Sequence, residues 1–258
     1  MKKRLSRLYF YLVLLFLYAP ILTLVVLSFN NNKSRAKWGG FSLRWYNELF
    51  HNATMMKALW ITVSVALIAA LISTVIGTVS AIALHKCRPR IRKALLDVTY
   101  VPMMNSDIVT GVSLMLLFAF LRIERGFLTL LLSHITFCIP YVILAILPKL
   151  YGINMSVYEA ALDLGATPFK AYTRILIPEI MPGIISGFLM SITLSIDDFV
   201  ISFFNTGHGV QNISILVNSS KKVGINPANY ALSALMFGAV IIILLIMNFK
   251  DSKRSNVQ

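Results

Sequence analysis

Residues 58–84 read ALWITVSVALIAALISTVIGTVSAIAL, a stretch without a charged side chain. An α-helix rises about 1.5 Å per residue and the hydrocarbon core of a bilayer is about 30 Å thick, so about 20 apolar residues cross it. This stretch is therefore long enough to span a membrane. Lipid cannot satisfy backbone N–H and C=O groups, and the stretch is too long for a barrel strand, so a helix is the predicted form.

Five further stretches of similar polarity lie on either side of it. Together they give six predicted transmembrane helices without Lys or Arg, at about residues 8–29, 58–84, 94–121, 126–147, 182–204 and 230–249. Only 13% of the chain is charged and 57% is hydrophobic, whereas about a quarter of a soluble domain is charged. We predict an all-α membrane protein whose residues 1–258 form a single transmembrane domain. Ser73, Gly77 and Ala81 follow the small-xxx-small spacing of closely packed helices.

The net charge of +14 is explained by membrane topology rather than by nucleic-acid binding. With the N-terminus inside, the inner segments carry 15 of the 24 Lys and Arg residues and the outer loops carry 9. Positive charge collects on the cytoplasmic side, so this count predicts that both termini are cytoplasmic. The basic cluster at residues 85–93 is the clearest anchor, a solvated loop beside anionic membrane lipid. No cleavage pattern follows the first apolar stretch, which is interpreted as a retained anchor.

The inner loop at about residues 149–181 is too long for a simple turn. It contains two amphipathic pieces that are joined at residues 165–167. Gly165 suits a chain reversal with positive φ, and Pro168 suits the first turn of the second piece. We predict a compact cytoplasmic helix pair that serves as a docking element.

This loop resembles the cytoplasmic signature of type I ABC importer permeases. The signature of that family is Glu-Ala-Ala, three residues, Gly, nine residues, Ile, one residue and Leu-Pro. The matching residues here are Glu159, Ala160, Ala161, Gly165, Ile175 and Pro178, and the single departure is Ile177 in place of Leu. The resemblance implies a type I importer permease fold, in which this coupling-helix loop sits in a groove of a separate ATPase and transmits its closure.

Stretches along nearly the whole chain resemble one branch of the family, the PotC-type permeases of spermidine/putrescine importers. The matching stretches are residues 18–20, 28–30, 45–46, 133–138, 162–166 and 194–198, while Ser106 stands where the branch has Pro. The resemblance implies a multi-pass polyamine permease of the bacterial inner membrane. Its partners would be a second permease subunit, a cytoplasmic ATPase dimer and an extracytoplasmic polyamine-binding protein. The chain has no phosphate-binding loop, so ATP and Mg²⁺ are expected on the ATPase, and neither a cofactor nor a catalytic residue is expected in this chain.

Three acids lie inside the predicted spans and away from their ends, namely Asp107, Asp197 and Asp198. Each costs about 2.5 to 3.5 kcal/mol at a helix centre, and no Lys or Arg in the six spans offsets them. Such residues usually face a water-filled cavity or a partner. The alternative, that they hydrogen-bond to neighbouring helices, stays open for each of them. His134, inside the fourth span, is predicted to be hydrogen-bonded to a neighbouring helix.

Helical spacing places the two adjacent acids on different faces of the predicted fifth helix. Asp197 lies about 100° around the helix from Asp198 and is interpreted as more structural, although it is kept among the pathway residues. Asp198 is assigned to the substrate pathway because it falls in one polar stripe, and Ser195 and Ser202 are assigned with it. The stripe consists of Ser191, Ser195, Asp198, Ser202 and Asn205.

Asp107 and Tyr100 share one face of the predicted third helix. A carboxylate beside an aromatic ring suits an alkyl-ammonium ion, because charge attraction combines with a cation–π contact. Asp107, Tyr100 and Asp198 are therefore expected to form a weak, transient site for spermidine or putrescine, since a tight site would hinder release.

Three other functions are compatible with the residues. An importer permease for another small solute would keep the same architecture. A proton-coupled secondary transporter would use the acids as a proton relay and would need neither the cytoplasmic helix pair nor ATP. A membrane-embedded enzyme is the weakest alternative, because no nucleophile–base pair and no clustered metal ligands stand out.

Overall fold

The computed structural model describes residues 2–34, 37–207, 209–223 and 226–255. Within these residues the chain is helical apart from connecting loops and one isolated β-bridge between Asn30 and Phe41, so the all-α prediction is confirmed. Contacts group the chain into two units. They are Met1–Met56 with Leu216–Gln258, and Lys57–Ile215.

Four helices of the described residues are long and apolar enough to cross a membrane. They are Tyr9–Ser28, Ala53–Lys86, Phe127–Tyr151 and Pro168–Asp197. A fifth candidate is a pair of helices, Pro89–Met104 and Asp107–Phe120, which are bent by 104°, and Ala228–Ile241 is a shorter apolar helix. The count of six spans stays a prediction.

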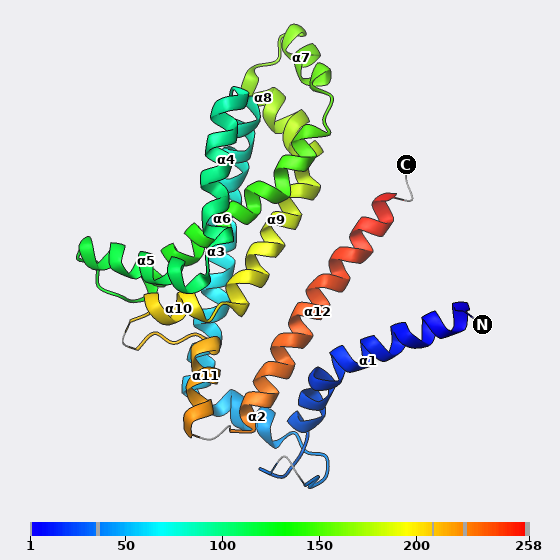
Figure 1. Cartoon of the computed structure of the whole chain (residues 1–258), viewed down its shortest axis with the longest axis vertical. Helices are drawn as coiled ribbons and strands as arrows, with labels where there is room; N and C mark the ends of the chain where they lie inside the picture. Colours follow the sequence, from blue (N-terminus) through cyan, green and yellow to red (C-terminus); the bar gives the residue numbers. More distant parts are fainter. Residues whose placement is uncertain (1, 35–36, 208, 224–225, 256–258) are drawn as a thin grey trace. The chain divides into compact units, whose positions relative to one another are not determined.

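The first unit is built from α1 (Lys2–Ser28), α2 (Arg44–His51) and α12 (Ala228–Ser255), and α11 (Ile213–Val223) crosses the boundary between the units. Both α1 and α2 contact α12, and the three can be followed in Figure 1. The face of α2 that carries Trp45 and Leu49 is buried. The Trp45 indole donates a hydrogen bond to the Asn30 carbonyl, which ties α2 to the loop after α1.

The second unit contains the remaining helices. They are α3 (Ala53–Lys86), whose first residues belong to the first unit, α4 (Pro89–Met104), α5 (Asp107–Phe120), α6 (Phe127–Tyr151), α7 (Met155–Asp163), α8 (Pro168–Ala171), a π-helix η1 (Tyr172–Leu176), α9 (Ile177–Asp197) and α10 (Val200–Asn205). Helices α6 and α9 pack along each other and carry much of the core (Figure 1).

Small residues allow three helices of this unit to approach closely. A Cβ on Gly187 of α9 would lie 3.2 Å from the Cα of Val142 on α6, and one on Gly183 would lie 3.0 Å from the Ala145 carbonyl oxygen. On α3, a Cβ on Gly77 would lie 2.6 Å from a methyl group of Val142. The close packing that the sequence predicts around Gly77 is therefore confirmed, because even one added methyl group would force Val142 of α6 to shift.

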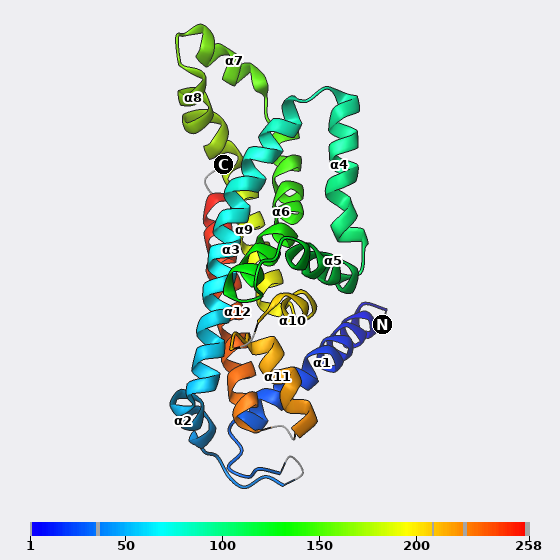
Figure 2. The ribbon, with the colours of Figure 1, turned by 90° about the vertical axis from the view of Figure 1, so that its left-hand side faces the viewer.

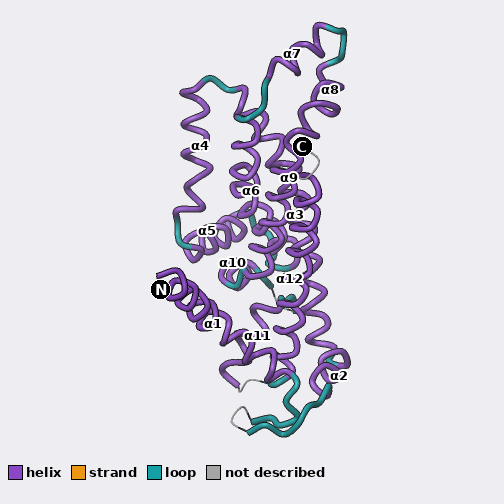
Figure 3. Tube along the Cα trace, turned by 90° about the vertical axis from the view of Figure 1, so that its right-hand side faces the viewer, coloured by secondary structure: helices purple, strands orange, loops and turns teal. Residues whose placement is uncertain are grey.

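Two helices that the sequence predicts as continuous are each interrupted beside an acid. The predicted helix 94–121 is divided into α4 and α5, which meet at 104° (Figures 2 and 3). The backbone is extended at Asn105 and Ser106, and the Ser106 hydroxyl caps α5 by accepting from the Ile108 N–H. The predicted helix 182–204 is divided into α9 and α10, with extended backbone at Asp198.

The loop between α6 and α9 forms a pair of helices, and hydrogen bonds within the loop satisfy backbone groups at the ends of these helices. Gly165 has a φ of +84°, as the sequence predicts, and ends α7 with two hydrogen bonds typical of a Schellman motif. In these bonds the Gly165 N–H reaches the Leu162 carbonyl and the Ala166 N–H reaches the Ala161 carbonyl. Pro168 occupies the first turn of α8, also as predicted.

Candidate functional site

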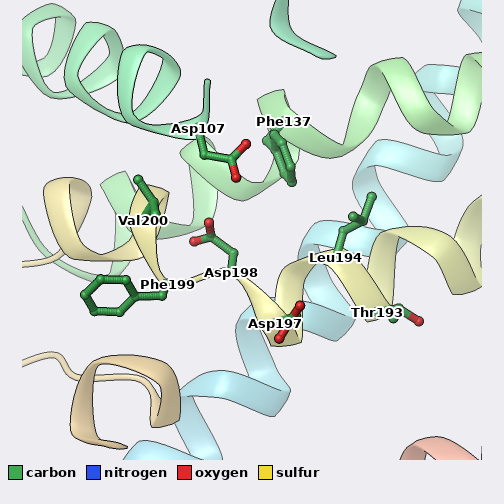
Figure 4. A pocket seen from close by; sticks show the side chains of 8 residues that line it. All are labelled: Asp107, Phe137, Thr193, Leu194, Asp197, Asp198, Phe199 and Val200. Atoms are coloured by element: carbon green, nitrogen blue, oxygen red, sulfur yellow. The ribbon is translucent and has the colours of Figure 1, made fainter. Parts of the chain in front are cut away.

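A cavity of about 270 Å³ in the second unit brings together the three acids that the sequence assigns to the substrate pathway. The carboxylates of Asp107 and Asp198 face one another across it, and Asp197 lies apart from them at the end of α9 (Figure 4). The lining residues are Asp107, Phe137, Thr193, Leu194, Asp197, Asp198, Phe199 and Val200. The cavity therefore combines carboxylate oxygens with apolar and aromatic walls.

Asp198 is held by the beginning of α10. Its Oδ1 accepts a hydrogen bond from the Ile201 N–H at 3.1 Å. Its Oδ2 accepts one from the Ser202 N–H and one from the Ser202 hydroxyl, both at 2.8 Å. The side chain is 5% exposed. These bonds offset the loss of hydration of the carboxylate, so the acid both stabilises the helix break and faces the cavity.

Asp107 is placed opposite Asp198 by a close crossing of α5 over α10. A Cβ on Gly111 of α5 would lie 3.4 Å from the Ile201 Cα. The Asn205 amide nitrogen donates to the Gly111 carbonyl at 3.1 Å and fastens the crossing. Asp107 is the first residue of α5, where the partial positive charge of the helix N-terminus favours a carboxylate. The same bend that interrupts the predicted helix thus brings the two acids face to face.

Two serines of the predicted stripe, Ser195 and Ser202, are buried and bond to His134 of α6. The Nδ1 of His134 lies 2.7 Å from the Ser195 hydroxyl, and its Nε2 lies 3.0 Å from the Ser202 hydroxyl and 3.6 Å from the Asp198 Oδ2. The prediction that His134 bonds to a neighbouring helix is confirmed. Ser195 and Ser202 are 2% and 0% exposed, so their hydroxyls contact the imidazole and their role in the pathway stays a prediction.

The aromatic residues that line the cavity do not include Tyr100, the aromatic residue that the sequence analysis predicted there. Tyr100 lies on α4 and is 38% exposed, outside the cavity lining, because the bend after α4 separates its face from that of Asp107. Phe137 and Phe199 line the cavity instead. Sequence reasoning missed both, although Phe199 directly follows Asp198 and Phe137 lies one turn from His134 on α6.

The residues of the coupling-helix signature lie on the loop before α9, except for Pro178, which lies in the first turn of α9. Glu159, Ala160, Gly165 and Pro178 are exposed, whereas Ala161 and Ile175 are partly buried. Two large apolar side chains that sequence reasoning did not single out, Leu164 and Phe169, are 89% and 77% exposed. The tip of the loop is therefore an exposed apolar surface.

A lysine and two tyrosines fasten the base of this loop. The Lys86 Nζ lies 4.6 Å from the ring centroid of Tyr172 and 5.6 Å from that of Tyr158, and the two rings are 5.2 Å apart. The hydrogen bond from Tyr158 to Tyr172 raises the pKa of Tyr158 above its ordinary value. The end of α3 is thereby connected to both helical pieces of the loop.

In the described part of the chain, no group of three His, Cys, Asp or Glu side chains is arranged to hold a metal ion. Helices that are long and apolar enough to cross a membrane, and acids that face a cavity between them, are typical of a membrane transport protein. The chain belongs to the family of inner membrane components of binding-protein-dependent transport systems, whose model matches residues 73–250. The resemblance to importer permeases seen in the sequence is therefore confirmed.

Two named relatives narrow this class. The chain is 43% identical to the putrescine transport system permease protein PotI of Escherichia coli, over 88% of this chain and 84% of the relative. It is 37% identical to the spermidine/putrescine transport system permease protein PotC of Haemophilus influenzae, over 96% of both chains.

Solved structures show the same fold at low sequence identity. A bacterial ABC transporter that imports alginate matches with a TM-score of 0.71 at 17% identity, over 98% of this chain and 96% of the other. The MetNI methionine ABC transporter matches with a TM-score of 0.60 at 16% identity, over 78% of this chain and 96% of the other.

Proposed function

We propose that this chain is a permease subunit of an ATP-binding-cassette importer that carries the polyamines spermidine and putrescine into the cytoplasm. Family membership and the printed functions of the PotI and PotC relatives support the proposal. The observation that carries it is the pair of carboxylates, Asp107 and Asp198, which face one cavity. An importer permease for another small solute is the second candidate, and an alginate importer has the same fold.

The chemistry of the cavity fits a protonated polyamine. No Lys or Arg of the described residues forms an ion pair with either acid, so the negative charge is available to ammonium groups. Phe137 and Phe199 offer apolar contact to the methylene chain and cation–π contact to the amines. In this proposal Asp107 and Asp198 bind the ammonium groups transiently, because a tight site would slow release.

The exposed loop supplies the proposed link to ATP hydrolysis. Glu159–Pro178 would dock on a cytoplasmic ATPase dimer that binds ATP and Mg²⁺, and closure of the ATPase would open the permease alternately to each side. The exposed Leu164 and Phe169 support this role, since apolar surface of this kind is covered at protein interfaces. A second permease subunit and an extracytoplasmic polyamine-binding protein complete the proposed complex, with six spans and both termini of this chain in the cytoplasm.

The direct test is uptake of labelled spermidine by the reconstituted complex, with and without ATP. Asp198→Asn is expected to lower the uptake rate per assembled complex by about tenfold or more, the scale of a hydrogen bond to a charged group. Asp97→Asn is the matched control, because Asp97 is an exposed acid on α4 outside the cavity. Wild-type uptake by Asp198→Asn in an intact complex would refute the proposed site.

The same vesicles separate an ATP-driven importer from a proton-coupled transporter. The proposal requires that uptake stop without ATP, even when a proton gradient is imposed. Uptake by the purified chain alone, driven by the gradient, would favour the secondary transporter instead.

A further inference from the structure

His134 lies at the junction of three helices, next to the break between α9 and α10. It projects from α6, is 1% exposed, and contacts Ser195 of α9 and Ser202 of α10. Ser202 in turn donates to the Asp198 carboxylate. The imidazole is therefore one hydroxyl group away from an acid that faces the cavity.

The donors and acceptors around Ser202 determine where its proton goes. Its oxygen lies 2.8 Å from the Asp198 Oδ2, 2.7 Å from the Asn212 amide nitrogen and 3.0 Å from the His134 Nε2. A carboxylate can only accept and an amide nitrogen can only donate. The single Ser202 proton therefore points to Asp198, whose Oδ2 lies closer than its carbonyl oxygen at 3.2 Å. The two lone pairs of the hydroxyl accept from Asn212 and from His134.

This assignment places a proton on Nε2, which donates to Ser202. Burial of the ring disfavours a second proton, so Nδ1 accepts from the Ser195 hydroxyl at 2.7 Å. All four groups are satisfied by a neutral ring. A neutral ring also leaves the charge of Asp198 uncompensated, although Nε2 is only 3.6 Å from its Oδ2. The negative charge of this carboxylate is therefore available to a cation that enters the cavity.

We propose that His134 is a positioning residue for the Asp198 site. Its Nε2–H holds the Ser202 hydroxyl in the orientation that donates to Asp198, and so keeps the carboxylate charged and aimed at the cavity. This inference rests on the proposed function of Asp198 in polyamine transport. It assigns to a buried histidine of α6, which does not line the cavity, a part in setting the strength of the Asp198 site.

Two amide variants separate this role from simple packing. The amide nitrogen of a glutamine reaches the place of Nε2, whereas the end of an asparagine reaches only the place of Nδ1. His134→Gln keeps the donor to Ser202, and His134→Asn keeps only the bond to Ser195. We expect His134→Gln to retain most of the uptake, and His134→Asn to lower the maximal uptake rate by about tenfold. The concentration of loaded binding protein that gives half-maximal uptake should stay unchanged in both.

The measurement is ATP-driven spermidine uptake per assembled complex, with assembly followed by co-purification of the ATPase. Equal uptake by His134→Gln and His134→Asn would overturn the inference, because the positioning role requires the donor to Ser202 that only His134→Gln keeps. Ser202→Ala tests the same link if His134→Asn prevents assembly. It should lower uptake as His134→Asn does, and wild-type uptake by Ser202→Ala would refute the link.

Asp198→Asn in the same assay separates this inference from the proposed function. If Asp198→Asn loses uptake while His134→Asn and Ser202→Ala transport like the wild type, the positioning role is refuted and the cavity site stands. If Asp198→Asn itself transports like the wild type, the cavity site is refuted together with the positioning role.

Discussion

The cavity around Asp198 and the loop from α7 to η1 interrupt the helices of the second unit in opposite ways. At the cavity, polar groups are buried and find their partners within the chain, as the bonds of His134, Ser202 and Asn212 illustrate. On the loop, the helix ends are satisfied locally, but Leu164 and Phe169 remain almost fully exposed. The difference indicates that the chain satisfies the polar groups around its cavity by itself, and the exposed apolar side chains of the loop support its proposed docking on the ATPase.

The largest effect is expected from a change in the exposed apolar surface of the loop, where the ATPase is proposed to bind. The double change Leu164→Asp and Phe169→Asp removes the exposed apolar surface, and burying each such side chain is worth about 1.5 to 3 kcal/mol. We expect ATPase co-purification to fall by about a hundredfold, because the lost burial of the two side chains adds. The purified chain should keep its wild-type thermal stability, since both side chains are exposed. Normal co-purification would contradict the assignment of this surface to the ATPase.

A smaller effect is expected from the turn that presents this surface. Gly165 has a φ of +84°, and no atom lies within 4 Å of the place where a Cβ would be. A side chain there is therefore disfavoured by the backbone conformation and not by a clash. Gly165→Val should cost about 1 to 2 kcal/mol and weaken ATPase co-purification by about tenfold. Gly165→Asn is the matched variant, because asparagine tolerates positive φ, and it should retain most of the binding. Identical behaviour of the two variants would show that the φ value is unimportant.

The smallest effect concerns the base of the loop. Lys86→Met removes an ammonium group that lies 4.6 Å from the centroid of the Tyr172 ring, and such a contact is worth about 0.5 to 1 kcal/mol at an exposed site. We expect transport per ATP hydrolysed to fall by about two- to fivefold. Lys86→Arg should restore it, and Lys93→Met, which removes an exposed charge elsewhere in the same basic cluster, should have no effect. A loss of the same size in Lys93→Met would indicate that only the charge of the cluster matters.

The sequence was sufficient to predict the features that depend on local chemistry. Long apolar runs predicted helices, and Gly165 followed by Pro168 predicted the turn and the restart of the loop. Burial of a histidine inside an apolar run predicted a hydrogen-bonded partner for His134. Each of these conclusions needs only a few neighbouring residues.

The two helix breaks, and with them the cavity, could not be predicted in this way. Apolar periodicity continues across Ser106 and across Asp198, and neither position has a glycine to mark an interruption. The signals present were a serine in front of Asp107, which suits a helix cap, and Pro102 one turn earlier. Because a continuous helix was assumed, Tyr100 was chosen as the aromatic partner, whereas the bend brings Asp107 to Phe137 and Phe199.

The central claim is that Asp107 and Asp198 together receive a cation, and charge reversal at Asp107 tests it most directly. Asp107 is exposed, so Asp107→Lys should be accommodated and should place a tethered ammonium group opposite Asp198. Spermidine uptake per assembled complex should then be highest in the wild type, about tenfold lower in Asp107→Asn, and abolished in Asp107→Lys. Equal uptake by the three proteins would contradict the account.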